Sequence, residues 1–433
     1  RSPRRPACLP RYRPRSFPLS RARSACAGRA WLQCSPGAGR RSAMPALPPK
    51  ETVAADSPDN PFGGGVWPLA LAWCAETAGG EFPDTMAVVD VGERGDVVCI
   101  GLEGGAISLY DGATGEELGA LTGHSDGSVL ALASAGRFLV SGGCDGAARV
   151  WDVERAVVEA CGSSEPSAAA LVRAVQLDGT TRSRSGAWVE AVAATEDCKG
   201  DGPFFAAASG KRVTVFSASD ALEPTALAPL GSTVTDLSFM RRPGEADADA
   251  ELAATCYGGV SVWPASSKSG AEPAIHMPYK GALESLAVSP DGGDWVVAGC
   301  QDRTVRIWFR PDWEARNYEM GGYVTKVTAC AFDASGKQMA SNGGGMKGTV
   351  PMVWNFSGEG PAHTVPVGLF GHDEQVRLLA WAPDKCDLVR GKGGLGALAT
   401  AGDDKTLLVW DVDVWEEGLP KRCFPFAAAT PEE

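Results

Sequence analysis

Residues 123–152 read GHSDGSVLALASAGRFLVSGGCDGAARVWD, and this stretch decides the fold. Its apolar and small residues gather in three short segments, at 129–133, at 138–142 and up to 150–152. A Cys-Asp-Gly turn separates the second segment from the third. Short apolar segments bounded by Gly, Asp and Ser are typical of β-strands. The stretch therefore predicts three consecutive strands, of which the third ends in Trp-Asp.

A second copy of this order lies near the C-terminal end of the chain. Gly371-His372 leads to apolar segments at 376–381, 397–401 and 407–410, and the last of these again ends in Trp-Asp. In both copies an Asp precedes the Trp by six residues and follows a Ser or Thr by four. A shorter match runs from Asp302 to Trp308. One pattern that recurs at distant positions indicates an internal structural repeat.

An aromatic residue closes the third strand of each repeat unit, and seven such residues follow one another along the chain. The intervals between them are 41, 65, 47, 45, 46 and 56 residues. A period of about 40–45 residues is typical of units with four strands each. The two longest intervals predict insertions, so seven units extend over residues 66–415. The closing aromatics are Tyr110, Trp151, Phe216, Trp263, Trp308, Trp354 and Trp410.

These Gly-His … Trp-Asp units resemble the WD-repeat family. The resemblance implies an all-β fold, a seven-bladed β-propeller whose blades are four-stranded antiparallel sheets. It also implies that a loop His, a strand Ser or Thr, a turn Asp and the strand Trp hydrogen-bond to one another within a blade. The residues at these positions are His124, Ser141, Asp145 and Trp151 in one unit, and His372, Thr400, Asp404 and Trp410 in another.

Closure of the ring explains how such blades become stable. A single four-stranded sheet cannot bury both its faces, but in a ring each blade covers its neighbour. One blade must then combine strands from both ends of the chain. Little strand-forming sequence follows Asp411, whereas residues 66–73 are apolar and precede the first complete unit. We expect residues 66–73 to form the outer strand of the last blade.

The two ends of the chain differ in composition from the repeats. Residues 1–43 contain 11 Arg and no acidic residue, which is typical of an organelle transit peptide. The alternative is translated upstream sequence, with Met44 as the true start. Residues 44–65 are rich in Pro and Gly and predict a flexible lead-in, and residues 416–433 form a C-terminal tail.

Charge limits the classes of partner. The chain carries a net charge of −13. Without residues 1–43, 29 basic residues face 53 acidic ones, so the body carries −24 (29 minus 53). Such a body repels phosphate backbones and argues against nucleic acid. It favours protein partners that present a basic patch. No run of about 18 apolar residues predicts a membrane span.

Cysteine and histidine usage argues against a metal or cofactor site. The 13 cysteines include no Cys-x-x-Cys pair, which predicts buried free thiols and a reducing compartment, the cytoplasm or the nucleus. A chloroplast or mitochondrion is the alternative if residues 1–43 are a transit peptide. Of the four histidines, two belong to the repeat, and we expect His276 and His363 in loops between units. They show no metal-ligand spacing.

Two glycine-rich runs resemble phosphate-binding motifs only formally. Residues 391–396 fit G-x-G-x-x-G, but an apolar strand follows them instead of a helix. Residues 343–348 lack the Lys-Ser/Thr ending of a P-loop. Residues 123–127 read Gly-His-Ser-Asp-Gly and fit the Gly-x-Ser-x-Gly nucleophile motif formally, but an apolar strand-like segment follows them instead of a helix. We expect no catalytic residue, cofactor or metal, and no enzyme activity.

The insertion around residues 155–187 is the region least like the repeat. It also holds the one helical pattern in the sequence, near residues 164–178. It holds a basic cluster with Ser183 and Ser185. This cluster is interpreted as a solvated loop, and the alternative is a phosphorylation site in which phosphate reverses the local charge.

The function that follows is a non-catalytic scaffold for protein–protein interaction and complex assembly. Its binding surface would be the rim and central mouth, including residues 125–128, 278–281 and 373–375. The alternative is an adaptor that recruits substrates to a multi-subunit enzyme such as a cullin-type ubiquitin ligase. Adaptors of that class carry Trp-Asp-x-Arg, and both Trp-Asp pairs here lack the Arg. An enzyme built on a propeller is a third hypothesis.

Overall fold

The computed structural model of the chain describes one compact unit. It lies within Thr52–Phe426, and the residues described are 70–77, 80–92, 95–124, 127–160, 170–177, 188–195, 203–219, 223–240, 250–290, 294–358, 360–361, 366–382, 397–412, 415–416 and 419–420. The predicted segments 1–43 and 44–65 lie outside these residues, as does nearly all of 416–433.

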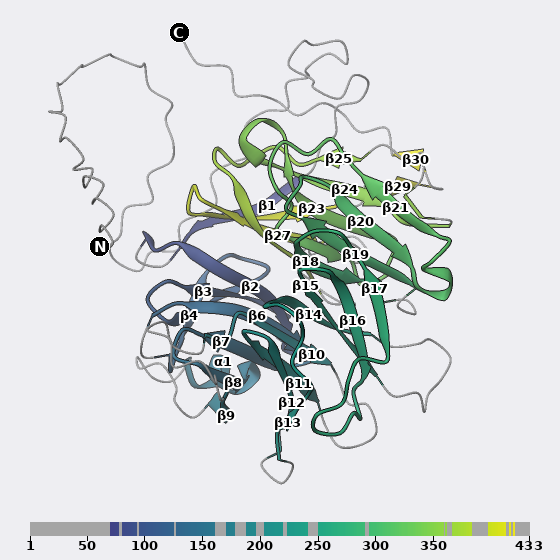
Figure 1. The fold of residues 1–433 in the computed structure, drawn as a ribbon. Helices are drawn as coiled ribbons and strands as arrows, with labels where there is room; N and C mark the ends of the chain where they lie inside the picture. Colours follow the sequence, from purple (N-terminus) through teal and green to yellow (C-terminus); the bar gives the residue numbers. More distant parts are fainter. Residues whose placement is uncertain are drawn as a thin grey trace, which may run out of the picture. The chain divides into compact units, whose positions relative to one another are not determined.

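Seven four-stranded antiparallel sheets make up this unit (Figure 1). We number these blades 1 to 7 along the chain. Blade 1 contains β2 (Pro83–Asp90), β3 (Asp96–Leu102), β4 (Ala106–Asp111) and β5 (Glu117–Thr122). Blade 2 contains β6 (Val129–Ala135), β7 (Phe138–Gly143), β8 (Ala147–Asp152) and β9 (Leu171–Gln176). Blade 3 contains β10 (Ala191–Thr195), β11 (Phe204–Ser209), β12 (Arg212–Ser217) and β13 (Thr225–Ala226).

The remaining four blades repeat this order. Blade 4 contains β14 (Val234–Met240), β15 (Glu251–Cys256), β16 (Gly259–Pro264) and β17 (Ile275–Pro278). Blade 5 contains β18 (Leu283–Val288), β19 (Trp295–Cys300), β20 (Val305–Phe309) and β21 (Asn317–Met320). Blade 6 contains β22 (Cys330–Phe332), β23 (Gln338–Gly344), β24 (Val350–Asn355) and β25 (Val367–Gly368). Blade 7 contains β26 (Val376–Trp381), β27 (Ala397–Gly402), β28 (Thr406–Asp411) and β1 (Ala70–Glu76).

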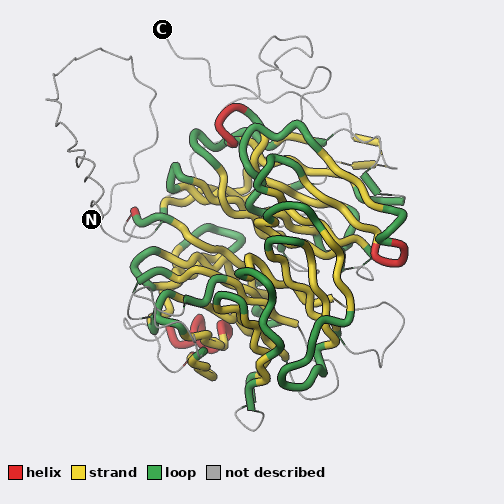
Figure 2. Tube along the Cα trace, in the orientation of Figure 1, coloured by secondary structure: helices red, strands yellow, loops and turns green. Residues whose placement is uncertain are grey.

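The blades stand in a ring, with the first strand of each blade beside the first strand of the next. Strands dominate the described residues, and helix is confined to short pieces (Figure 2). The predicted fold class, a seven-bladed propeller with four-stranded antiparallel blades, is confirmed. A small hairpin, β29 (Trp415–Glu416) with β30 (Leu419–Pro420), lies outside the seven sheets.

Blade 7 closes the ring with strands from both ends of the chain. β1 pairs antiparallel with β28, in a register that runs from Ala70 opposite Asp411 to Glu76 opposite Thr406. The predicted closure is therefore present, although the strand extends further along the chain than the expected residues 66–73. Residues 66–69 lie outside the described part of the chain.

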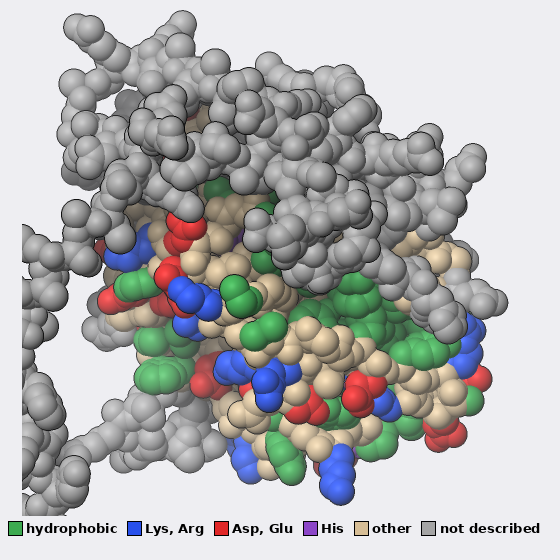
Figure 3. Space-filling model, turned by 90° about the horizontal axis from the view of Figure 1, so that it is seen from above, with side chains coloured by type: hydrophobic (Ala, Val, Ile, Leu, Met, Phe, Trp, Pro, Cys, Tyr) green, Lys and Arg blue, Asp and Glu red, His purple; other side chains and the backbone are tan. Residues whose placement is uncertain are grey.

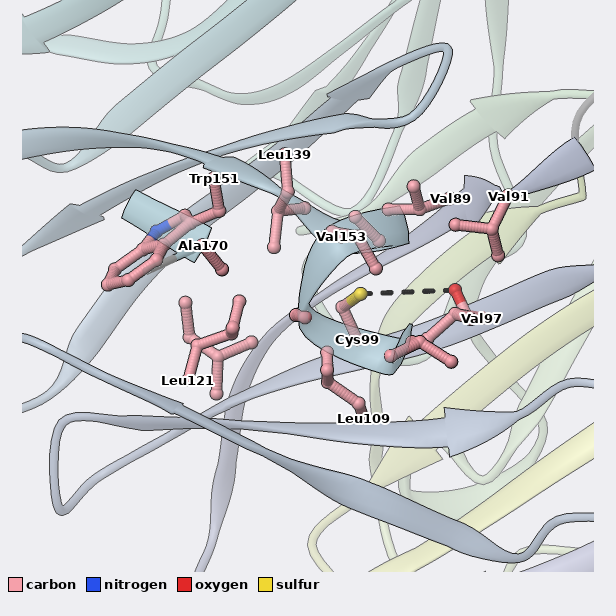
Figure 4. Close-up of a cluster of buried hydrophobic side chains, with 14 of the residues drawn as sticks. Val89, Val91, Val97, Cys99, Leu109, Leu121, Leu139, Trp151, Val153 and Ala170 are labelled. Atoms are coloured by element: carbon pink, nitrogen blue, oxygen red, sulfur yellow. Dashed lines mark hydrogen bonds between the residues drawn. The ribbon is translucent and has the colours of Figure 1, made fainter. Parts of the chain in front are cut away.

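The core is divided into seven clusters of buried side chains, one between each pair of neighbouring blades. In the cluster between blades 1 and 2, Val97, Cys99 and Leu109 face Leu139 and Trp151 (Figure 4). The figure also shows a hydrogen bond from Cys99 Sγ to the Val97 carbonyl, 3.9 Å long. Each blade thus has both faces covered, which removes their apolar area from water.

The insertion after β8 contains a helix, α1 (Val153–Ala160). Val153, Ala156 and Val157 are buried in the cluster between blades 1 and 2, which explains why an amphipathic segment forms a helix here. The expectation of a helix near residues 164–178 was wrong. Most of the described residues in that range form β9, the outer strand of blade 2, because they pair with β8.

Candidate protein-binding surface

The predicted hydrogen-bonding residues of blade 2 lie together beneath a loop. His124 Nδ1 lies 3.0 Å from Asp145 Oδ1, and His124 Nε2 lies 2.7 Å from Ser141 Oγ. Trp151 Nε1 donates a hydrogen bond of 2.9 Å to the same Ser141 Oγ. The chain of bonds thus links a loop, a turn and two strands, so it fixes the loop onto the blade.

Blade 7 repeats the arrangement. His372 Nδ1 lies 2.9 Å from Asp404 Oδ2, and His372 Nε2 lies 2.8 Å from Thr400 Oγ1. Trp410 Nε1 donates to Thr400 Oγ1 over 2.9 Å. Asp404 also accepts bonds from the backbone amides of Asp373 and Thr406, so its carboxylate holds two different segments.

The pKa shifts of His124 and Asp145 indicate the charge states in the blade 2 network. Burial lowers the pKa of His124, and the charge of Arg149 lowers it further, although the hydrogen bond to Asp145 acts in the opposite direction. Burial by itself raises the pKa of Asp145, but the hydrogen bonds from His124 and the Ala147 amide, together with the charge interactions with His124 and Arg149, outweigh burial and bring the pKa below its usual value. At neutral pH a neutral imidazole therefore donates to a carboxylate.

The connectivity Ser–His–Asp also occurs in hydrolases, yet the geometry of blade 2 leaves no place for a substrate. Ser141 is 0% exposed, and its Oγ already accepts the indole N–H of Trp151. A nucleophile must reach a substrate atom. The bonds within the His124 and His372 networks support a structural role for them. Asp145 Oδ2 is buried without a hydrogen bond and lies 2.7 Å from Arg149 Nη1, which balances its charge.

Two blades use tyrosine where the sequence pattern would require histidine. Tyr323 Oη lies 2.7 Å from Ser341 Oγ and accepts a hydrogen bond of 2.9 Å from Trp354 Nε1 in blade 6. In blade 5, Tyr279 Oη donates to Asp302 Oδ2 over 2.9 Å. A search for Gly-His missed both residues. The signal that could have found them is the aromatic residue in the connection before each unit.

Each closing aromatic lies on the third strand of its blade and packs against the preceding blade. Trp354 is half-buried and the others are buried. They serve as packing residues between blades. They are Tyr110, Trp151, Phe216, Trp263, Trp308, Trp354 and Trp410.

Two kinds of connection build one face of the propeller, here called the upper face. Because the strands of a blade alternate in direction, the turn between the second and third strands lies at the same end as the connection to the next blade. The predicted binding segments 278–281 and 373–375 lie in connections from one blade to the next, and so do residues 127 and 128. Residues 125 and 126 lie outside the described part of the chain.

Large exposed hydrophobic side chains gather on the upper face. Seven such residues are exposed among the described ones, and all but Leu171 lie in turns or connections of this face. Met346 is 86% exposed and Tyr257 67%. Exposed apolar side chains that cluster on one face indicate a site of protein association. The others are Phe82, Trp188, Val324 and Phe370.

The central channel opens into a cavity of about 430 Å³ at the opposite end. Its walls are mostly small and apolar residues of the first strands of six blades, for example Ala87, Ala287 and Ala380. Deeper in the channel, the carboxylate of Asp236 accepts hydrogen bonds from the amides of Leu237 (2.8 Å) and Leu286 (2.7 Å). Burial raises the pKa of Asp236 to about 6.

Other predicted features are resolved in part. His276 lies in β17 and not in a loop, because it faces Ser261 Oγ at 3.1 Å across the sheet.

His363, Ser183, Ser185 and the run 391–396 lie outside the described residues. Among the described residues, no group of His, Cys, Asp and Glu could hold a metal ion. No helix found there is long and apolar enough to span a bilayer.

Seven sheets around a central channel define the class of the protein, a seven-bladed β-propeller. The family model for the WD domain, G-beta repeat, matches residues 115–152, 276–308 and 364–411. The chain therefore carries WD repeats in these three regions of a seven-bladed propeller. WD40 propeller proteins are generally non-catalytic scaffolds that bind other proteins.

The comparison with solved structures adds support for the fold. The chain is similar to a chain of the structure described as "Crystal Structure of Mitotic Checkpoint Complex", with 17% identity and a TM-score of 0.58. The match covers 80% of this chain and 96% of that chain. At this identity the likeness shows the fold alone. No curated protein matches the sequence.

Proposed function

We propose that the protein is a non-catalytic scaffold that assembles other proteins on its upper face. The observation that carries the proposal is the distribution of exposed hydrophobic side chains, six of seven of which lie on this face. A rigid ring holds these side chains in fixed positions, so binding does not require the scaffold to become ordered first.

The acidic body supports a protein partner with a basic patch and argues against nucleic acid or a membrane surface as ligand. Figure 3 shows acidic, basic and hydrophobic side chains intermingled on the described surface of one side. Cys99, Cys256 and Cys300 are buried free thiols, which supports a reducing compartment, the cytoplasm or the nucleus.

Affinity capture of the full chain followed by mass spectrometry tests the proposal. The double variant Tyr257→Asp, Met346→Asp changes two side chains that are well exposed on the upper face, so folding should not change. We expect it to lose proteins that the wild-type chain captures. The control Leu171→Asp alters an exposed residue on β9, away from the upper face, and should keep them.

The result would contradict the proposal if both variants captured the same proteins as the wild-type chain. Recovery of cullin-type ligase subunits with the wild-type chain would instead favour the adaptor hypothesis. A melting curve of each variant separates a loss of binding from a loss of fold.

A further inference from the structure

A continuous arc of segments crosses the upper face over blades 6, 7 and 1. We call residues 323–326, 343–348, 373–377, 403–405, 80–84 and 103–105 the 6–7–1 arc. Hydrogen bonds and one ion pair join each segment to the next. The atom pairs are Val324 N and Gly343 O at 3.0 Å, Lys347 Nζ and Glu374 Oε1 at 3.8 Å, Asp403 N and Gln375 O at 2.9 Å, Lys405 Nζ and Gly80 O at 2.6 Å, and Gly104 N and Glu81 Oε2 at 3.0 Å.

The arc presents three apolar side chains to solvent. Met346 is 86% exposed, Val324 49% and Phe82 44%. Met346 stands on a turn whose next residue, Lys347, has φ of 68°, a conformation that non-glycine residues rarely adopt. The turn is wedged between connections, because an added Cβ at Gly348 would meet both Thr325 and Gln375. A rigid turn thus holds an adaptable, polarizable side chain outward.

The charges of the arc leave an excess of carboxylates. Each of its four cations already has a partner: Lys326 lies 3.6 Å from Glu284, Lys347 pairs with Glu374, Arg377 with Asp403, and Lys405 lies over the Phe82 ring at 4.4 Å. Asp84, Glu103 and Asp373 are exposed and form no direct ion pair among the residues that the structure describes, although the charge of Asp84 also acts on Arg377 and raises its pKa. The free charge along this arc is therefore negative.

Over blades 3 to 5 the balance of the upper face differs. Three cations, Lys211, Lys280 and Arg303, lie in the described turns and connections there, against two carboxylates, Glu190 and Asp302. Tyr257 is the exposed apolar residue of that sector. A basic ligand would therefore be drawn to blades 6, 7 and 1 and away from Tyr257, because complementary charge steers association and like charge opposes it.

We propose that the 6–7–1 arc binds an extended segment of a partner protein in which apolar side chains alternate with Lys or Arg. The apolar residues would pack on Met346, Val324 and Phe82, and the basic ones would pair with Asp84, Glu103 and Asp373. This inference rests on the proposed scaffold function and names the ligand class and the sector of the upper face that takes it. A few anchors of this kind carry most of the binding free energy in protein interfaces.

A displayed library of short random peptides, selected on the full chain, tests the assignment. The recovered peptides should combine Lys or Arg with Leu, Met or aromatic residues. Their affinity, measured by fluorescence polarisation, should fall about tenfold or more with Met346→Asp, equivalent to about 1.4 kcal/mol. Asp373→Lys should weaken binding as well, and added salt should reduce the wild-type affinity. The matched control Tyr257→Asp should leave the affinity unchanged.

Three results would overturn the proposal. The first is recovery of no peptide, or of peptides without basic residues. The second is loss of binding with Tyr257→Asp but not with Met346→Asp, in which case the upper face still binds proteins and only its assignment to the arc fails. The third is a dimer of the chain that Met346→Asp dissolves, since the arc would then bind a second copy.

Discussion

At the scale of single residues, the turn aspartates hold the blades to their loops. The Asp404 side chain is only 11% exposed and bonds to His372, to the Asp373 amide and to Thr406. Replacing it with Ala leaves the buried partners unsatisfied, so Asp404→Ala should reduce the free energy of unfolding by about 1–3 kcal/mol. A thermal melt with no shift would contradict this prediction.

Asp403 supplies the control for Asp404→Ala, and the pH dependence of the free energy of unfolding provides a second test of Asp404. Asp403 forms an exposed pair with Arg377, so Asp403→Ala should cost less than about 1 kcal/mol. Burial raises the pKa of Asp404, but the hydrogen bonds from His372 and from the Thr406 hydroxyl and amide, together with the charge interaction with His372, outweigh burial and bring the pKa to about 2. Its stabilisation is therefore complete above the unfolded pKa near 4 and is lost as the pH falls towards 2. Asp404→Ala should lack that loss.

The sequence pattern identified the network residues at positions that keep the usual side chain of the repeat. It missed network residues at positions where a different side chain makes the same hydrogen bonds. Asp145 and Asp404 were found because only a carboxylate accepts bonds from both a His and the turn amides. Tyr323 was missed because a phenol hydroxyl can also bond to Ser341 and Trp354. The geometry of the blade, not the residue name, is what recurs.

At the scale of strands and turns, Asp236 links two blades that share no strand pairing. It lies on β14, and it accepts the amide of Leu286 on β18. Burial raises the pKa of Asp236 from 3.8 to about 6, so the folded state takes up a proton more readily than the unfolded state. Stability should therefore rise as the pH falls from about 7 towards 4, by at most about 3 kcal/mol.

Urea unfolding of the wild-type chain and of Asp236→Asn at several pH values checks this sign. The neutral carboxamide can still accept an amide N–H, so the free energy of unfolding of the variant should lack this rise. The nearby Cys330 thiol, whose pKa burial raises to about 12, stays neutral throughout. Parallel pH curves for the two proteins would show that Asp236 does not titrate in this range.

Gly360 shows a second contact between blades, at the turn after β24. It has φ of 97°, and an added Cβ would lie 2.7 Å from two ring atoms of Trp295. That ring cannot move easily, because it is 6% exposed and packs against Phe309 and Phe356. Gly360→Ala should therefore cost about 1–3 kcal/mol through overpacking, beyond the cost of the backbone conformation.

A matched control separates these two costs. Gly358 also has positive φ, 72°, but an added Cβ would meet nothing within 4 Å. Gly358→Ala should therefore carry only the backbone cost, of order 1 kcal/mol. Equal chemical-denaturation midpoints for the two variants would rule out a contribution from the Trp295 contact.

The strands could be predicted because each one carries a local signal, whereas the insertion could not. A closing aromatic and a turn mark β8, β20 and β28 in the sequence itself. The helix α1 depends on burial against blades 1 and 2, and such long-range packing leaves only a weak trace in the local pattern. For the same reason, the charge balance of the 6–7–1 arc appears only after distant segments are brought together.

At the scale of the whole molecule, stability depends on closing the ring. Deleting residues 44–75 would remove β1 and leave the edge of β28 without its partner from Thr406 to Asp411. An unpaired strand edge promotes association between chains, so the deletion should lower the melting temperature and produce aggregates in size-exclusion chromatography. The control deletion of residues 44–65 retains β1 and should keep the melting temperature of the full chain. A soluble, fully folded protein without residues 44–75 would show that β1 is dispensable, because a three-stranded blade 7 would then suffice to close the propeller.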